Sequence, residues 1–247
     1  MVQEAQGQWQ VLGAAPSYDA FVSAAFDAPL DWRESRFHGS EPDIALLLEA
    51  ARKLGAASVD VIAMDIPLAR TQITGRRPSD LAVSKAFGGR GCSTHSPNST
   101  RPGQISDSLI RQLESNGFQL DTAVSAAEAA PRAIEVYPHP ALLKLLDRDY
   151  RVPYKVGNSS KYWRGESVQL RITRLIDEFT SIYRGLTREL GNIPFDLPAA
   201  NDVGSLSFLK RYEDALDALV CAWVGKQHAL KYTRAYGDED SAIWVPE

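Results

Sequence analysis

Two short apolar segments, each bounded by turn-forming residues, constrain the fold most strongly. They are VDVIAMDIPL (residues 59–68) and PRAIEVYPHP (residues 131–140). Mostly apolar runs of this length are typical of strands that helices cover on both faces. The first run follows EPDIALLLEAARKLGA (residues 41–56), which predicts a helix with acids at its start and basic residues in its last turn. A helix that leads into a buried strand predicts a layered α/β fold.

Other segments extend this layered pattern. The segment GQWQVLGAAP (residues 7–16) alternates between apolar and polar positions, which predicts a half-buried strand. Amphipathic helices are expected over residues 107–118, 166–190 and 206–231. We therefore expect one α/β domain over residues 1–247, in which residues 150–205 can form a helical insertion.

Several classes of protein are disfavoured by simple features of the chain. No apolar run approaches the length of about 18 residues that a membrane span needs. The opening MVQEAQGQWQ lacks the apolar segment of a secretory signal peptide. Two cysteines, Cys92 and Cys221, are too few for a disulfide framework or a cysteine zinc site. We expect a cytoplasmic protein with no membrane association.

Positive charge is concentrated in two segments of an otherwise acidic chain. The formal net charge is −4, yet residues 70–101 hold six Lys/Arg against one acid and residues 148–174 hold seven against two. Each segment therefore carries a local charge of +5, which favours a directed anionic ligand such as nucleic acid or a nucleotide. Two solvated basic surfaces are an equally good explanation of these counts. The candidate contact residues are Arg76, Arg77, Arg90, His95, Arg101, Lys155 and Lys161.

Four carboxylates occupy positions that suit a site. Asp65 comes at the end of the first buried strand, and Glu135 lies within the second. In EDALDALVCAWVG, Asp214, Asp217 and Cys221 share one helical stripe, opposite the apolar positions. Ligands of open α/β sheets collect at the carboxyl ends of the strands, which favours Asp65 in particular.

Each of these acids also has a structural alternative. Asp65 can cap a helix or form a turn. Glu135 can pair with Arg132 or a nearby lysine, because a buried charge needs a partner. Asp214 and Asp217 can face water near the start of their helix, where they interact favourably with its dipole. These alternatives stay open on the sequence alone.

Taken together, the four acids predict a site for a hard cation. Carboxylates that converge without a set of histidines or cysteines prefer Mg²⁺ or Mn²⁺. We expect Asp65, Asp214 and Asp217 to be the metal ligands and Glu135 to complete the catalytic set. Such ions can activate water and stabilise a leaving oxygen in phosphodiester cleavage, while the basic segments hold the phosphate backbone.

Several longer motifs resemble one known family. These motifs are AMDIPL, TGRRPSDLAVSKAFGGRGCSTHSPN, AIEVYPHPALLKLL, YEDALDALVCAWVG and YGDEDSAIWVPE. Over about residues 8–247 they are similar, in the same order, to those of domain-of-unknown-function family 429, regarded as predicted nucleases of the ribonuclease-H-like fold. The resemblance implies a mixed sheet flanked by helices. It also implies that Asp65, Glu135, Asp214 and Asp217 occupy the family's acidic positions.

The beginning of the chain departs from the family pattern. Members usually start with a strand that carries a G-[IV]-D motif, whose aspartate is the central metal ligand. This chain opens at MVQEAQGQWQVLGAAP, which matches what normally follows that strand. We therefore expect either a start further upstream or a fold that lacks the first strand and has an incomplete metal site.

Two main functional hypotheses follow from these features. The first is a metal-dependent nuclease or phosphodiesterase that uses acidic residues. The second is a catalytically degenerate protein that binds nucleic acid or a nucleotide without cleaving it, and the missing first acid favours this hypothesis. A phosphotransferase is a weaker third hypothesis, because the chain has no glycine-rich phosphate loop.

Overall fold

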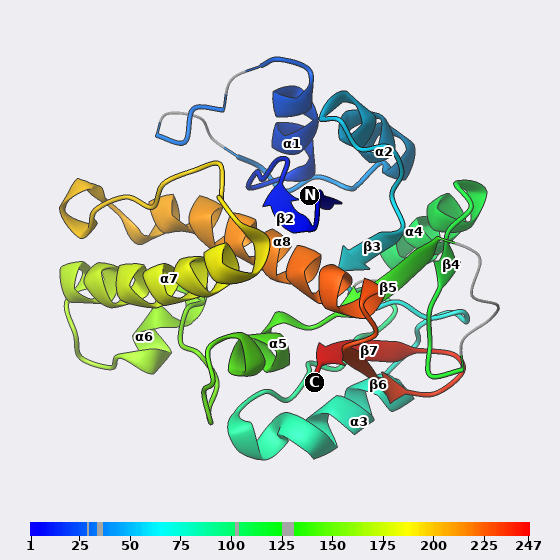
Figure 1. Cartoon of the computed structure of the whole chain (residues 1–247). Helices are drawn as coiled ribbons and strands as arrows, with labels where there is room; N and C mark the ends of the chain where they lie inside the picture. Colours follow the sequence, from blue (N-terminus) through cyan, green and yellow to red (C-terminus); the bar gives the residue numbers. More distant parts are fainter. Residues whose placement is uncertain (29, 34–36, 102–103, 125–130) are drawn as a thin grey trace.

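The computed structural model describes residues 1–28, 30–33, 37–101, 104–124 and 131–247 (Figure 1). Its strands include β3 (Val61–Met64), β4 (Gln119–Leu120), β5 (Arg132–Val136), β6 (Thr233–Gly237) and β7 (Ala242–Pro246). They form a five-stranded sheet of order β3-β5-β7-β6, in which β4 also pairs with β5. β3, β4 and β7 run parallel to β5, and β6 is antiparallel to β7. Both predicted buried strands are therefore present, as neighbours in one mixed sheet.

Helices pack on both faces of this sheet, either directly or against other helices. They are α1 (Tyr18–Ala25), α2 (Ile44–Lys53), α3 (Pro78–Phe87), α4 (Gln104–Ser115), α5 (Pro138–Leu145), α6 (Ser159–Tyr162), α7 (Val168–Leu190) and α8 (Leu206–Ala229). The long helices α7 and α8 lie side by side, and α8 also packs against β3 and β7 (Figure 1). The predicted helices correspond to α2, α4, α7 and α8. Among the described residues, no helix combines the length and apolar character needed to cross a membrane.

Alternating side chains of β5 divide the core into two layers. Ile134 and Val136 pack into a cluster with residues of α5, α7 and α8. Ala133 points to the opposite face, where it packs with residues of α2 and α4. On β7, Ile243 and Val245 pack with residues of α3. Since successive strand residues point to opposite faces, the register of the strands decides which acids can meet.

A separate antiparallel hairpin precedes the main sheet. It consists of β1 (Val2–Ala5) and β2 (Gln8–Val11), so the strand predicted within residues 7–16 is confirmed as β2. Within the described part of the chain, β3 has β5 as a partner along one edge and no strand partner along the other. The arrangement is consistent with the ribonuclease-H-like α/β fold, with the hairpin outside the main sheet.

Residues 150–205 contribute to the same core as the sheet. Besides α6 and α7 they contain η2 (Val156–Asn158) and η3 (Ala200–Asp202). Phe179 of α7 lies in one apolar cluster with Leu216 of α8 and Ile134 of β5. Gly185 brings α7 close to α5, because a Cβ at this glycine would lie 3.1 Å from the Cγ atom of Leu145. The predicted helical segment therefore packs onto the sheet layer.

Candidate functional site

Asp65 and the middle of α8 approach each other at the end of β3. Ala63 packs on the α8 side of the sheet, and strand alternation turns Asp65 toward the same side. Removal from water raises the pKa of Asp65 to about 7, and the Asp217 carboxylate is the strongest charge that acts in the same direction. Burial raises the pKa of the Cys221 thiol, and the charges of Asp65 and Asp217 add to this effect. Two members of the predicted helical stripe therefore face the strand-end acid.

The Asp65 carboxyl group has no direct partner in the described part of the chain. Asp65 is still exposed to solvent, although protein atoms surround its carboxyl group on most sides. No described residue donates a hydrogen bond to this group. Lys155 and Lys210 lower its pKa only from a distance, through their charge. An acid with a pKa near 7 can take up or release a proton at neutral pH.

Asp217 is held in a fixed orientation by the segment between α5 and η2. The Tyr154 hydroxyl donates a hydrogen bond of 2.6 Å to its Oδ1 atom, and the Lys155 ammonium contacts Oδ2. Burial raises the pKa of Asp217, while the charge and hydrogen bond of Lys155 and the hydrogen bond of Tyr154 oppose the increase. The sequence predicted Asp217 and Lys155 as site residues, but it gave no role to Tyr154.

Glu213 is a member of the cluster that the sequence interpretation missed. Its side chain is almost fully buried and accepts a hydrogen bond of 2.6 Å from the backbone N–H of Val156. Lys210 Nζ lies 2.9 Å from its Oε1 atom, and Lys155 Nζ lies 3.6 Å from the same atom. Glu213 precedes Asp217 by four residues, which places both on one helix face. That spacing was the signal in the sequence.

Asp214 lies at the outer end of the cluster. Its side chain is 37% exposed and contacts the Lys210 ammonium. Burial raises its pKa, and Lys210 opposes the increase. Glu213, Asp214 and Asp217 each offer a carboxylate oxygen, and these three atoms lie within 4.8 Å of one another. The group can therefore hold a metal ion, and Asp65 stands beside it through its interaction with Asp217.

The charges of this cluster do not balance. Four carboxylates (Asp65, Glu213, Asp214, Asp217) face two lysines (Lys155 and Lys210), so the fully ionised cluster has a charge of −2. Burial alone would lower the pKa of Lys155, but Asp217 and Glu213 raise it above its usual value, so the ammonium stays charged. A divalent cation would neutralise the remaining charge.

Glu135 is on the other face of the sheet and is part of a buried ion-pair network. Its register partner on β3 is Met64, whose side chain packs with the α2 and α4 layer. Arg77 Nη2 donates to Glu135 Oε1 at 2.7 Å and to Asp80 Oδ1 at 3.0 Å, and the backbone N–H of Leu68 donates to Glu135 at 2.7 Å. The expected partner of Glu135, Arg132 or a lysine, is thus replaced by Arg77.

This network also changes the interpretation of Arg77 as a substrate contact. Arg77 is 5% exposed, and its guanidinium donates to Asp80, Glu135 and the carbonyl of Leu68. Burial alone would lower the pKa of Arg77, but Glu135 and Asp80 raise it above its usual value. Burial raises the pKa of Glu135 to about 7, against the hydrogen bonds from Arg77 and Leu68. Arg77 and Glu135 therefore contribute to structure, and neither is free to bind a ligand.

The other predicted basic contacts are spread over the surface. Arg76 is exposed and donates to Ser84 Oγ at 2.6 Å, and Arg101 is exposed in an isolated bridge with Asn98. Arg90 donates to the carbonyl oxygens of Arg148 and Asp149 at 2.6 and 2.9 Å, so it connects two loops. Of the predicted basic contacts, Lys155 is the one that touches the carboxylate cluster directly. The remaining two, His95 and Lys161, line a common pocket.

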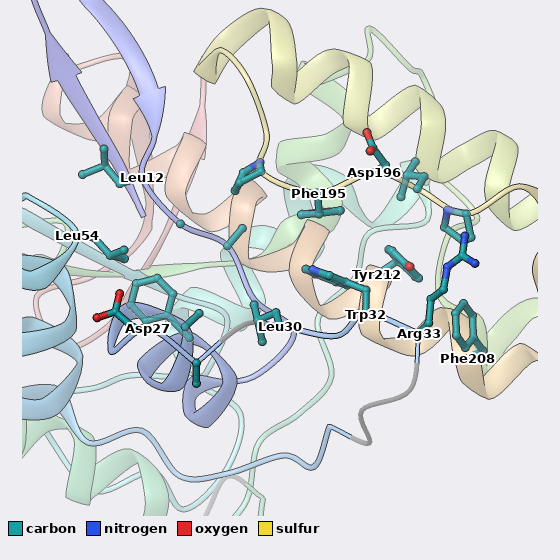
Figure 2. Close-up of a pocket in the computed structure, with 18 of the residues that line it drawn as sticks. Leu12, Asp27, Leu30, Trp32, Arg33, Leu54, Phe195, Asp196, Phe208 and Tyr212 are labelled. Atoms are coloured by element: carbon teal, nitrogen blue, oxygen red, sulfur yellow. The ribbon is translucent and has the colours of Figure 1, made fainter.

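A different pocket of about 1010 Å³ lies between the N-terminal segment and the first half of α8 (Figure 2). Aromatic rings form much of its wall: Trp32 stacks on Phe195 at 4.5 Å and on Tyr212 at 5.2 Å between centroids. Figure 2 shows these side chains close together, with Asp196 and Arg33 nearby. None of the predicted site residues lines this pocket.

Fold and site together define a mixed α/β protein with an acidic cluster between a strand end and a long helix. The model of the family described as "Protein of unknown function (DUF429)" matches residues 9–241. The chain therefore belongs to this family, which confirms the resemblance of its motifs. Comparisons with curated proteins and with solved structures gave no match.

Proposed function

We propose that this protein is a metal-dependent phosphodiester hydrolase, with Mg²⁺ or Mn²⁺ held by Asp65, Asp214 and Asp217, and that nucleic acid is its substrate. The observation that supports this most strongly is the excess negative charge where Asp65 faces α8. Carboxylate oxygens are the ligands that these hard cations prefer. Glu213 joins the proposed set, because its carboxylate belongs to the same group of close oxygens.

Each residue has a part that follows from its contacts. Tyr154 orients Asp217 through its hydrogen bond, which leaves the aspartate little rotational freedom. Asp65, whose pKa is about 7 without a metal ion, would lose its proton when its carboxylate ligates the ion. Lys155 keeps a positive charge beside these acids, where it can interact with a phosphate oxygen. A bound divalent ion would supply water activation and stabilisation of the leaving oxygen.

A second candidate function, binding of nucleic acid or a nucleotide without cleavage, is favoured by the position of Lys155. Its ammonium contacts Asp217 and lies 3.6 Å from Glu213, so it already compensates part of the charge that a metal ion would neutralise. Glu135, which was expected to complete the catalytic set, is committed to Arg77. In this case the acids would serve mainly to hold Lys155.

The experiment that tests the proposal measures Mn²⁺ binding and cleavage of single- and double-stranded DNA and of RNA. Asp217→Asn should weaken Mn²⁺ binding at least about tenfold, or about 1.4 kcal/mol, and abolish cleavage. Asp177→Asn, a change of an exposed aspartate on α7, is the matched control and should leave both unchanged.

The possible results separate the two candidate functions. Binding of Mn²⁺ with cleavage that Asp217→Asn abolishes supports the hydrolase. Binding of nucleic acid without cleavage of any substrate supports the second candidate. Failure of the protein to bind Mn²⁺ at millimolar concentration contradicts the metal site.

A further inference from the structure

A second pocket, distinct from the aromatic pocket of Figure 2, joins the two basic segments of the chain. It has a volume of about 560 Å³, within the usual range for small-ligand sites. Its wall includes His95 from the first basic segment and Arg151, Lys161, Tyr162 and Trp163 from the second. Segments that are about sixty residues apart thus contribute to one concave surface. We call this surface the basic pocket.

The charge of the basic pocket suits an anion. Arg151 and Lys161 line it together with His95, and no aspartate or glutamate is among its lining residues in the described part of the chain. Lys161 is exposed and makes no ion pair at contact distance with a described residue. This differs from Lys155 and Lys210, which acids of α8 already hold. The basic pocket therefore has positive charge available for a ligand.

Two buried polar atoms in its wall lack a protein partner. Arg151 is positioned by bonds from its Nη atoms to His139 Nε2 (2.7 Å) and to the carbonyl of Gly91 (3.4 Å). Its Nε atom is buried and has no hydrogen-bond partner among the described residues, and the same holds for the Tyr162 hydroxyl. Both atoms are closed off from solvent, so a ligand would meet the more exposed groups of the wall, the Lys161 ammonium and the Tyr150 ring.

Aromatic rings border the same space. Tyr150 is 65% exposed, and its ring packs against the backbone of Gly91. Gly91 has a φ of +77°, and a Cβ atom there would lie only 2.8 Å from Tyr150 Cζ, so no other residue fits this position without displacing the ring. The rings of Tyr162 and Trp163 lie 5.7 Å apart at 73°. Exposed rings beside cations are the features with which proteins bind nucleotide bases and their phosphates.

We propose that the basic pocket binds one nucleotide unit, with its base on Tyr150 or Trp163 and its phosphate at Arg151 and Lys161. The unit can be a free mononucleotide or part of a single strand, and both present the same chemistry. This proposal deepens the proposed function, on which it rests for its biological meaning, by naming the substrate unit held beside the carboxylate cluster.

The basic pocket and the carboxylate cluster share a wall. His139 lies between them, because its ring contacts Arg151 on one side and Tyr154 on the other. Arg151 bonds to this histidine from the pocket side, while Tyr154 packs against its ring at 5.5 Å and donates to Asp217. Arg151, His139, Tyr154 and Asp217 thus form one continuous series of contacts between the basic pocket and the carboxylate cluster.

The test titrates the full chain in EDTA with four probes: adenosine 5′-monophosphate, adenosine, inorganic phosphate and a fluorescent single-stranded oligodeoxynucleotide. Lys161→Ala, Tyr150→Ala and Arg151→Lys should each weaken binding of the monophosphate or the oligonucleotide at least about fivefold. Lys85→Ala and Tyr232→Ala change an exposed lysine and an exposed tyrosine elsewhere and should have no effect.

Each outcome decides the proposal. Loss of oligonucleotide binding alone identifies a strand as the ligand, and loss of monophosphate binding alone identifies a free nucleotide. Inorganic phosphate that binds as well as the monophosphate, with Tyr150→Ala without effect, would overturn the nucleotide site in favour of a simple anion site. Absence of binding of all four probes would also overturn it. Because EDTA removes divalent ions, absence of nucleotide binding in this test does not contradict the metal site. Equally, absence of Mn²⁺ binding does not contradict the nucleotide site.

Discussion

Asp65 and Glu135 come from neighbouring strands of one sheet and differ by a single step in register. Glu135 pairs with Met64, the last residue of β3, and Asp65 is the residue that follows it. That step turns Glu135 toward Arg77, whose guanidinium donates to it, and turns Asp65 toward Asp217, which repels it. Glu135 therefore has a structural role, because the Arg77 cation compensates its charge. Asp65 is a candidate for metal binding or catalysis, because a second acid faces it.

Removal of the partner's charge should have opposite effects on the two acids: it should destabilise the fold at Glu135 and relieve repulsion at Asp65. Glu135 depends on a buried donor, so removal of its partner leaves an uncompensated charge in the core. Asp65 is destabilised by its partner, so neutralisation of either acid relieves repulsion. The following predictions use this contrast, beginning with the largest expected effect.

Removal of Arg77 should cause the largest loss of stability. Arg77→Met should lower the free energy of unfolding by about 3–5 kcal/mol at pH 7, because Glu135 and Asp80 then lose their buried partner. Urea denaturation followed by circular dichroism measures the change. Arg76→Met alters the neighbouring exposed arginine and should stay within about 0.5 kcal/mol. A loss below about 1 kcal/mol for Arg77→Met would mean that the network is dispensable.

Neutralisation of Asp65 should change the pH dependence of stability. The folded state raises the pKa of Asp65 from 3.8 to about 7, so it binds this proton more tightly than the unfolded state does. The resulting stability is full below about pH 4 and is lost as the pH rises through 7. In EDTA at pH 8, Asp65→Asn should therefore be more stable than the natural chain, by about 1 kcal/mol after allowance for the solvent exposure of Asp65.

The control for this comparison is the same titration at pH 4, where the two proteins should have nearly equal stability. Asp177→Asn should have the same free energy of unfolding as the natural chain at pH 4 and at pH 8. Equal stability of Asp65→Asn and the natural chain at pH 8 would show that Asp65 is not under electrostatic strain.

The outer acid of the cluster should contribute least. Asp214 is 37% exposed and pairs with Lys210 at a spacing of four residues on α8. Asp214→Asn should change the free energy of unfolding by no more than about 0.5 kcal/mol in EDTA, as for other exposed helical ion pairs. A loss above about 1.5 kcal/mol would show that Asp214, like Glu135, belongs to an ion pair that stabilises the fold.

The elements that carry the site could be predicted from local patterns. Apolar runs with turn signals identified β3 and β5, and helical periodicity placed Asp217 and Cys221 on one stripe of α8. The rule that strand ends collect ligands pointed to Asp65. Each of these patterns lies within one segment of the sequence, so it can be recognised without knowing which helices and strands pack together.

The partners of these residues depend on tertiary contacts and could not be predicted in the same way. Arg76 and Arg77 are equivalent in a charge count, yet Pro78 begins α3 and places Arg77 at its N-cap, where the Asp80 carboxylate accepts a hydrogen bond of 3.0 Å from the Arg77 backbone N–H. Tyr154 reaches Asp217 across 63 residues of sequence. The face of each strand acid follows from sheet register, which a single sequence leaves open.

The most direct test of the central claim is a ¹³C NMR titration of the Asp65 carboxyl group in EDTA, assigned by the signal that Asp65→Asn removes. We predict an apparent pKa of about 7, a lower value in Asp217→Asn because a repelling charge is gone, and a further decrease when Mg²⁺ replaces EDTA. A pKa near 3.8 that neither Asp217→Asn nor Mg²⁺ changes would contradict the claim that Asp65 and α8 form one acidic site.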